Sequence, residues 1–108
     1  MTEPTVILRA LFLTTALASL AACTGGSNGG LLTGVMLTRY PDDFGAIWCR
    51  VPVIDMTRFH LFPAGKAWMD EYGNPDDPVQ RATLAVYSPL HTIQPGRRYP
   101  PTLIVTHE

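Results

Sequence analysis

The chain has 108 residues, with eight lysines and arginines against nine aspartates and glutamates, so its formal charge is −1. This balance argues against a nucleic-acid-binding protein, which usually presents a basic surface. Hydrophobic residues make up 46% and charged residues 16% of the chain, which is too apolar for a disordered protein, and the length allows one domain at most. Two cysteines, Cys23 and Cys49, are too few for a disulfide scaffold, although one pair could form in an oxidising compartment.

Residues 1–22 differ in composition from the rest of the chain. The run Ala10–Ala22 is apolar or small throughout. It is too short to span a bilayer, which takes about 20 residues, but it has the length of the apolar region of a signal peptide. The stretch Leu20–Cys23 resembles a bacterial lipobox, in which the cysteine is lipidated after cleavage. The positive charge expected before such a run is weak, because only Arg9 is basic and Glu3 offsets it.

Two other interpretations of this stretch compete with export. Leu17–Thr24 leads directly into a glycine-rich loop, so it is a buried strand if that loop is functional, and lipidation of Cys23 would destroy such a strand. Alternatively, residues 1–22 are a misread start joined to a genuine downstream segment. Alanine and leucine are poor strand formers, which slightly favours export or misreading. Export would place the chain in the periplasm or cell envelope, with membrane contact through a lipidated Cys23; otherwise a cytoplasmic location is expected.

Helices and strands alternate after this stretch. Apolar residues at helical spacing predict a helix over Leu31–Tyr40, which Pro41 ends because the residue before a proline avoids the helical conformation. The apolar run Ala46–Ile54 predicts a buried strand, whose end is weakened by Arg50 and Pro52.

The rest of the chain continues the alternation. Its expected elements are an irregular stretch over 55–65, a helix over Lys66–Tyr72, a cap at Asp77 followed by Pro78, a helix over Val79–Val86, a loop from Ser88, a turn at Pro95–Gly96 and a strand over Thr102–Thr106. Strands separated by helical crossovers predict a parallel sheet of the α/β class, which normally needs both faces covered. With two or three strands, the chain is expected to be part of a larger domain.

The glycine-rich loop at residues 25–29 matches the pattern G-x-S-x-G. In a nucleophile elbow the serine lies on a strained turn between strand and helix, where side chains beside it would collide with the turn. The following helix points its positive dipole end at the site, and the N–H of Asn28 is placed to donate to a developing oxyanion. So short a pattern also occurs in plain turns, but the helix predicted immediately after it favours a catalytic role for Ser27.

Several motifs in register resemble the prolyl oligopeptidase family of serine peptidases. They are Gly25–Leu32, Asp55–His60, Ala67–Trp68, Asp70–Gly73, Tyr87–His91 and Tyr99–Pro100. The resemblance covers residues 25–108 and implies a partial α/β-hydrolase fold, an incomplete parallel sheet with helices. The chain is accordingly divided into a signal-like or misread segment, 1–22, and a partial peptidase domain, 23–108.

The resemblance also implies roles for individual residues. Ser27 matches the nucleophile, and Asn28 matches the residue whose backbone N–H forms half of the oxyanion hole. Val53, Trp68 and Tyr72 match a pocket for the proline ring of a peptide substrate, although each is also an ordinary type of core residue. A flat indole and an apolar wall suit a rigid pyrrolidine ring. The implied reaction is hydrolysis of a peptide bond after proline through an acyl-serine, without a cofactor or a metal.

The histidine and aspartate that a serine hydrolase needs are not found at the expected places. In the family both follow the strand that here is Thr102–Thr106. His60 and His91 match family positions outside the triad, and only the terminal Glu108 follows His107. We therefore expect a catalytic-domain fragment that is inactive alone. The alternative is a small exported lipoprotein or peptide-binding module without catalysis.

The remaining polar residues are expected to have structural roles. The pairs Asp42–Asp43 and Asp76–Asp77 lie at a turn or helix start, where carboxylates are locally stabilising, and no metal site is expected there. Cys49 is expected to be a buried strand residue. Arg50 is expected to form a structural ion pair in preference to a contact with substrate.

Overall fold

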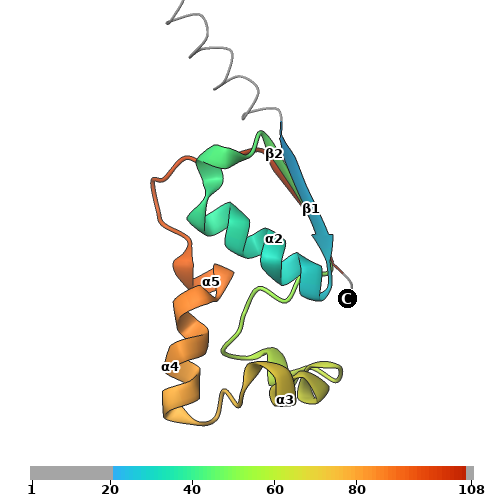
Figure 1. The fold of residues 1–108 in the computed structure, drawn as a ribbon, viewed down its shortest axis with the longest axis vertical. Coiled ribbons are helices and arrows are strands. Elements are labelled where there is room, and N and C mark those ends of the chain that lie inside the picture. The colour runs from blue at the N-terminus through green and yellow to red at the C-terminus, as the bar shows by residue number, and fades with distance from the viewer. Residues whose placement is uncertain (1–20, 107–108) are drawn as a thin grey trace, which may run out of the picture.

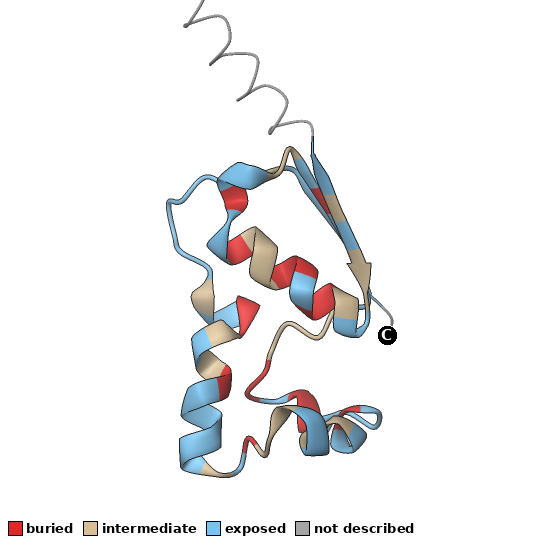
Figure 2. Cartoon of the chain, in the orientation of Figure 1, coloured by how far each residue is buried: buried red, intermediate tan, exposed pale blue. Residues whose placement is uncertain are grey.

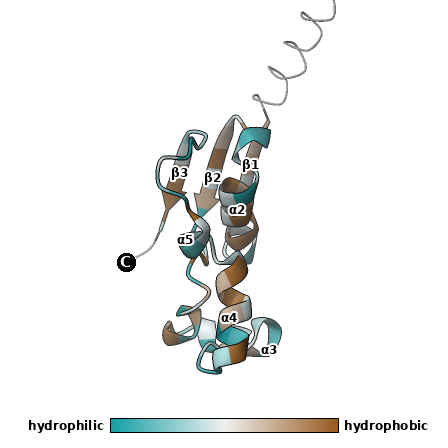
Figure 3. Cartoon of the chain, turned by 90° about the vertical axis from the view of Figure 1, so that its left-hand side faces the viewer, coloured by the Kyte–Doolittle hydropathy of each residue, from teal (hydrophilic) through white to brown (hydrophobic). Residues whose placement is uncertain are grey.

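The computed structural model describes residues 21–106, and Figure 1 shows their arrangement. Three short strands, β1 (Ala22–Gly26), β2 (Ala46–Arg50) and β3 (Thr102–Val105), form a parallel sheet in the order β1-β2-β3. Helix α2 (Asn28–Arg39) connects β1 to β2 and lies against one face of the sheet, as Figure 3 shows from the side. The expected partial α/β fold is therefore confirmed.

Strand β1 overlaps the strand that was predicted as one of three interpretations of the N-terminal stretch. It begins and ends later than the expected Leu17–Thr24, and it contains Cys23, which pairs with Ile47 of β2. Residues 1–20, on which the signal-peptide and misread-start interpretations depend, lie outside the described residues, and the boundary between residues 22 and 23 remains a prediction. No helix within residues 21–106 is long and apolar enough to cross a membrane.

Helix α2 begins three residues earlier than the predicted Leu31. Its first residue, Asn28, follows Ser27 directly, so the helix starts inside the glycine-rich loop. It ends at Arg39, and the prediction that Pro41 stops it is confirmed: the chain leaves the helical conformation at Tyr40, whose φ is −126°.

Strand β2 ends at Arg50, four residues before the predicted Ile54. Val51 has a positive φ of 43°, which is incompatible with a strand. Pro52 follows and has no N–H to donate to a neighbouring strand. The strand therefore ends near Arg50 and Pro52, where the sequence predicted that it would be weak. The turn at Val51 was not predicted.

One face of β2 is covered by α2, so burial alternates along the strand. Ile47 and Cys49 are each 2% exposed, whereas Trp48 is 47% exposed on the opposite face. In β3, Leu103 pairs with Trp48 and is 57% exposed. Within the described residues the predicted buried strand is therefore buried on one face only, because no second layer covers Trp48 and Leu103.

Residues 51–101 lead from β2 to β3 through short helical turns. These are the 3-10 helices η2 (Phe59–Leu61) and η3 (Gly65–Trp68) and the α-helices α3 (Met69–Tyr72), α4 (Pro78–Tyr87) and α5 (Pro89–Thr92). The predicted cap of α4 is confirmed, because Asp77 Oδ1 accepts hydrogen bonds from the N–H groups of Val79 (2.9 Å) and Gln80 (3.0 Å). The predicted helix over Lys66–Tyr72 is instead a 3-10 turn that continues into an α-turn. A further turn, α5, replaces the loop expected from Ser88.

The hydrophobic core lies between α2, α4 and the segment around η2, where Figure 2 shows buried residues facing one another. Its buried members are Leu31, Met56, Phe59 and Leu84. The hydroxyl of Ser88 ties the layers together by accepting from the Met56 N–H (3.0 Å) and donating to the Ile54 carbonyl (3.2 Å). The core therefore fixes the segment after β2 relative to the start of α2, beside Ser27.

Candidate active site

Ser27 forms a sharp turn between the last residue of β1 and the first residue of α2. Its φ and ψ are 54° and −116°, and among residues 21–106 only Ser27 and Val51 are non-glycine residues with positive φ. Such a conformation costs about 1–3 kcal/mol and persists where the surroundings over-determine it. Three hydrogen bonds do so here: the Ser27 N–H donates to the Arg50 carbonyl (3.0 Å), and the Ser27 carbonyl accepts from Gly30 (3.0 Å) and Leu31 (3.3 Å).

The glycines around Ser27 have unequal roles. A Cβ at Gly25 would lie 2.2 Å from the Gly29 carbonyl oxygen and 2.4 Å from Thr33 Oγ1, so β1 and α2 could not keep their distance. A Cβ at Gly29 would meet nothing within 4 Å, and the expectation that side chains on both sides of the serine collide is therefore wrong for Gly29. Gly30, which the pattern does not include, is constrained instead, because its Cβ would lie 2.7 Å from Pro52 Cα.

The hydroxyl of Ser27 and the N–H of Asn28 both lack a hydrogen-bond partner within residues 21–106. Serine at this position usually caps the helix with its side chain, but Ser27 forms no such hydrogen bond, and its side chain is exposed. Within residues 21–106 the N–H of Asn28 has no acceptor. It points out of the first turn of α2, where the helix dipole also favours negative charge.

The three residues expected to line a proline pocket lie around the same core. Val53, Trp68 and Tyr72 are half-buried, and each packs against the buried cluster of Leu31, Met56, Phe59 and Leu84. The ring of Tyr72 meets Phe59 edge-on, with 5.7 Å between ring centroids. The Tyr72 hydroxyl donates a hydrogen bond to Asn28 Oδ1. The structure therefore brings Tyr72 next to the elbow, a contact that the sequence did not predict.

None of the described histidines contacts Ser27. His60 is buried, and its Nε2 lies 3.0 Å from Asp76 Oδ1. His91 Nδ1 lies 2.9 Å from the hydroxyl of Ser88. His107 lies outside the described residues. A base for Ser27 is therefore not found within residues 21–106.

Ser88, His91 and Asp55 form a serine–histidine–aspartate group, but its geometry is not that of a triad. A triad histidine uses one ring nitrogen for the serine and the other for the carboxylate. Here the same atom, His91 Nδ1, faces both, at 2.9 Å from Ser88 Oγ and 4.0 Å from Asp55 Oδ1. Ser88 is also fully buried. This group holds the layers together and cannot reach a substrate.

The carboxylate of Asp55 is held by its neighbours. Burial opposes its ionisation, but hydrogen bonds from Arg58 and Thr57 outweigh that effect and lower the pKa of Asp55. Thr57 donates through both its N–H (3.1 Å) and its hydroxyl (2.8 Å). Asp55 thereby fixes the turn that precedes the core residue Phe59.

Arg50 and Cys49 lie on β2, and Asp42 lies in the turn before that strand. Arg50 forms no ion pair within residues 21–106; its guanidinium lies 5.1 Å from the centroid of the Trp48 ring, so the expected structural ion pair is wrong. Cys49 is buried as expected and its thiol donates to the Gly30 carbonyl (3.3 Å); burial, with a smaller contribution from Cys23, raises the pKa of that thiol. Asp42 lies in the first turn of a 3-10 helix, as expected.

The two cysteines are both free thiols. In the parallel register Cys23 pairs with Ile47, whereas Cys49 pairs with Gly25. The cysteines are thus offset by two residues on adjacent strands, and diagonal neighbours of this kind are too far apart for a disulfide without movement of the backbone. The register of β1 and β2 therefore disfavours a Cys23–Cys49 disulfide, which the cysteine count alone allowed.

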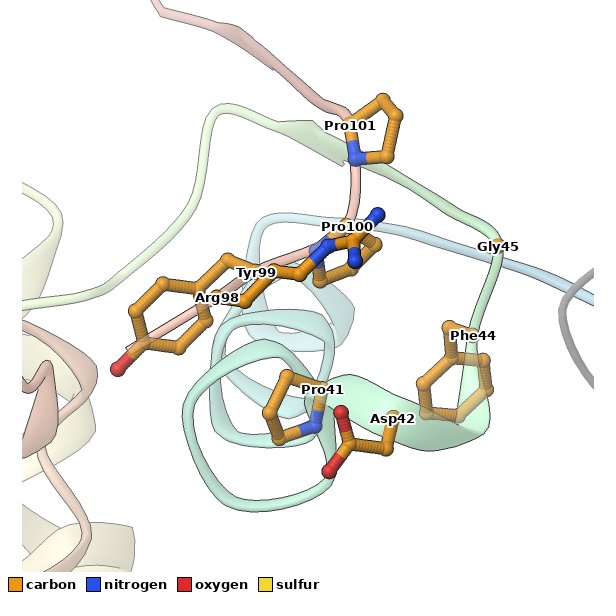
Figure 4. A pocket seen from close by; sticks show the side chains of 8 residues that line it. All are labelled: Pro41, Asp42, Phe44, Gly45, Arg98, Tyr99, Pro100 and Pro101. Atoms are coloured by element: carbon orange, nitrogen blue, oxygen red, sulfur yellow. The ribbon is translucent and has the colours of Figure 1, made fainter. Parts of the chain in front are cut away.

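A cavity of about 310 Å³ lies beside the segments that lead into β2 and β3 (Figure 4). Its lining includes Asp42, Phe44, Arg98 and Tyr99, together with Gly45 and Pro101, which precede β2 and β3. Ser27 follows the carboxyl end of β1, and in a parallel sheet the carboxyl ends share one edge. This cavity therefore takes no part in the site.

Comparison with known proteins agrees with this geometry. The model of the prolyl oligopeptidase family matches residues 11–108. An uncharacterized peptidase of Rickettsia prowazekii is 46% identical over 80 residues, which are 74% of this chain and 11% of that protein. The chain thus spans about a tenth of the length of the curated relative. Nothing in the comparisons supports the alternative of a small exported lipoprotein.

Solved structures are similar over the same region. A post-proline cleaving enzyme from Rickettsia typhi has a TM-score of 0.76 and 35% identity, over 88% of this chain and 14% of that one. Prolyl oligopeptidase B from Galerina marginata, bound to a 25mer macrocyclization substrate, has a TM-score of 0.76 and 39% identity, over 81% and 12%. With its strained serine between strand and helix, the chain is a partial α/β-hydrolase domain that belongs to the prolyl oligopeptidase family of serine peptidases.

Proposed function

We propose that this chain supplies the nucleophile, one oxyanion donor and the proline pocket of a peptidase that cleaves after proline. The observation that carries the proposal is the conformation of Ser27. Its positive φ is held by three backbone hydrogen bonds while its hydroxyl caps nothing and is exposed. A strained residue that the surroundings hold in place, with its reactive group left free, is typical of a nucleophile.

In the proposed reaction Ser27 Oγ attacks the carbonyl carbon of the peptide bond that follows a proline. The hydroxyl proton passes to a base, and the carbonyl oxygen becomes an oxyanion that accepts a hydrogen bond from the N–H of Asn28. Collapse of this intermediate breaks the C–N bond, and the base returns the proton to the leaving amine. Water then attacks the acyl-serine ester and restores the Ser27 hydroxyl.

The base and its orienting carboxylate come from outside residues 21–106 in this proposal. His60 and His91 are both engaged in the core and form no contact with Ser27. A serine hydroxyl without a base is a poor nucleophile near neutral pH. The activity therefore belongs to a complete catalytic domain, of which this chain is one part.

Specificity for proline is proposed to come from Val53, Trp68 and Tyr72. All three are anchored on the core that also contacts the start of α2, so their exposed surfaces stand in a fixed relation to Ser27. An indole face and an apolar wall match the flat, rigid pyrrolidine ring better than a flexible side chain. The peptide bound in the related fungal enzyme is consistent with a peptide substrate.

A hybrid enzyme tests the proposal. The matched segment of the Rickettsia typhi enzyme is replaced by residues 21–106, so that the host supplies the base and the carboxylate. We expect the hybrid to release a chromophore from a proline-linked substrate, and Ser27→Ala to abolish release without lowering the unfolding temperature. A folded hybrid that has no turnover, or whose turnover survives Ser27→Ala, would contradict the proposal.

A further inference from the structure

The hydrogen bond between Tyr72 and Asn28 joins two parts of the site that the sequence separates by 44 positions. Asn28 is the first residue of α2 and belongs to the elbow. Tyr72 is the last residue of α3 and belongs to the wall of the proposed pocket. From these positions we infer that Tyr72, besides lining the pocket, is a positioning residue for the oxyanion donor Asn28; this inference rests on the proposed function.

The ring of Tyr72 is well placed to hold another group. It packs edge-on against the buried ring of Phe59 and against the core cluster, so its hydroxyl has a defined position. Burial, with Glu71 and Tyr87 adding to it, raises the pKa of the Tyr72 phenol. A tyrosine phenol is protonated at neutral pH in any case, and an upward shift does not change that, so the Tyr72 hydroxyl can donate to Asn28 Oδ1.

The side chain of Asn28 forms no other hydrogen bond within residues 21–106. It is exposed, and within residues 21–106 the N–H of Asn28 has no acceptor. The peptide that carries this N–H is held at its other end, because the Ser27 carbonyl accepts hydrogen bonds from the N–H groups of Gly30 (3.0 Å) and Leu31 (3.3 Å). The hydrogen bond from Tyr72 adds a restraint on the Asn28 side of this peptide and helps to keep the N–H directed at the place of the oxyanion, where small errors of orientation weaken transition-state stabilisation.

The same contact couples substrate binding to the elbow. A proline ring that packs on Tyr72 rests on the side chain that holds Asn28. Loss of the hydroxyl should therefore affect turnover more than binding, because the aromatic wall remains. A residue that only lines the pocket would change KM instead.

The test uses the hybrid enzyme with proline-linked substrate. Tyr72→Phe keeps the ring and removes the donor, and Asn28→Ala removes the acceptor but keeps the N–H. A net hydrogen bond is worth about 0.5–1.5 kcal/mol, so we expect each variant to lower kcat about 2- to 10-fold, with KM within about two-fold. The double variant should be no slower than the slower single variant, because both remove one interaction.

Tyr87→Phe is the matched control. Tyr87 also packs against the core, and within the described residues its hydroxyl forms no hydrogen bond, so kcat should not change. An unchanged kcat in Tyr72→Phe, additive losses in the double variant, or an equal loss in Tyr87→Phe would each overturn the inference. A hybrid without turnover would instead contradict the proposed function on which the inference rests.

Discussion

Two glycines of the G-x-S-x-G pattern should respond very differently to the same substitution. In Gly25→Ala the new Cβ would lie 2.2 Å from the Gly29 carbonyl oxygen, whereas real Cβ contacts essentially never fall below 3.0 Å. The nearest atoms cannot simply turn away: one is helix backbone, and the other, Thr33 Oγ1, is hydrogen-bonded to that same carbonyl at 2.7 Å. Strand and helix must therefore separate by roughly 0.8 Å, the difference between these two distances.

Ser27 joins the two elements that would move apart, so it should be displaced by a similar amount. A misplacement of about 1 Å in an active site can cost about 100-fold in rate. We therefore expect Gly25→Ala in the hybrid enzyme to lower kcat/KM about 100-fold on a chromogenic proline substrate. Overpacking of this kind also costs about 1–3 kcal/mol in stability, which a lower unfolding temperature would report.

Gly29→Ala is the matched comparison, because its Cβ meets nothing within 4 Å and its φ is not positive. Alanine is preferred to glycine within a helix by about 0.5–1 kcal/mol, so this variant should unfold at the same or a higher temperature. Its kcat/KM should stay within about three-fold of the unaltered hybrid. Equal losses in the two variants, or a fully active Gly25→Ala, would refute the reasoning from contact distances.

Four further outcomes are expected. The isolated chain should be marginally folded, because the apolar surfaces of Trp48 and Leu103 are open; a cooperative thermal transition with a monomeric elution volume would contradict this. It should also show no peptidase activity on a proline-linked substrate, and turnover that Ser27→Ala removes would reveal an overlooked base. In the hybrid, Trp68→Ala should lower kcat/KM by at least about ten-fold for proline substrates and less for alanine substrates, because only the ring fills the pocket; an equal fall on both would assign Trp68 to packing alone. The pKa of Asp55 is lowered in the folded chain, so its stabilisation is present above the unfolded pKa of about 3.9 and is lost as pH falls through the folded value. The unfolding temperature of the hybrid should therefore exceed that of its Asp55→Asn variant at pH 7 and approach it below about pH 4; a gap that persists in acid would exclude this linkage.

Features with a local physical cause could be predicted from the sequence alone. The cap at Asp77 and the helix stop before Pro41 depend on side chains and backbone within a few residues, and both are present. The elbow at Ser27 was also recognisable, because its glycines, serine and following helix are contiguous. The resemblance of several motifs in register then indicated the family, which the comparisons confirm.

Features that depend on distant parts of the chain were decided only by the tertiary structure. The face of β2 that α2 covers was not predictable, because an apolar run such as Ala46–Ile54 does not reveal which of its alternating side chains will meet the helix. Val51 has a positive φ although its residue type favours strands, while its N–H still donates to the carbonyl of Val105 in β3, more than fifty positions away.

The placement of Gly30 and Tyr72 in the site also depends on distant parts of the chain. Gly30, and not Gly29, is the glycine that the packing of α2 requires, because Pro52 approaches it from the segment after β2. Tyr72 reaches Asn28 only because the core around Phe59 turns its ring toward the elbow. The sequence by itself indicated which residues are candidates for the site, since that depends on their type and local order; their mutual placement was decided by long-range packing, which leaves no pattern in any single segment.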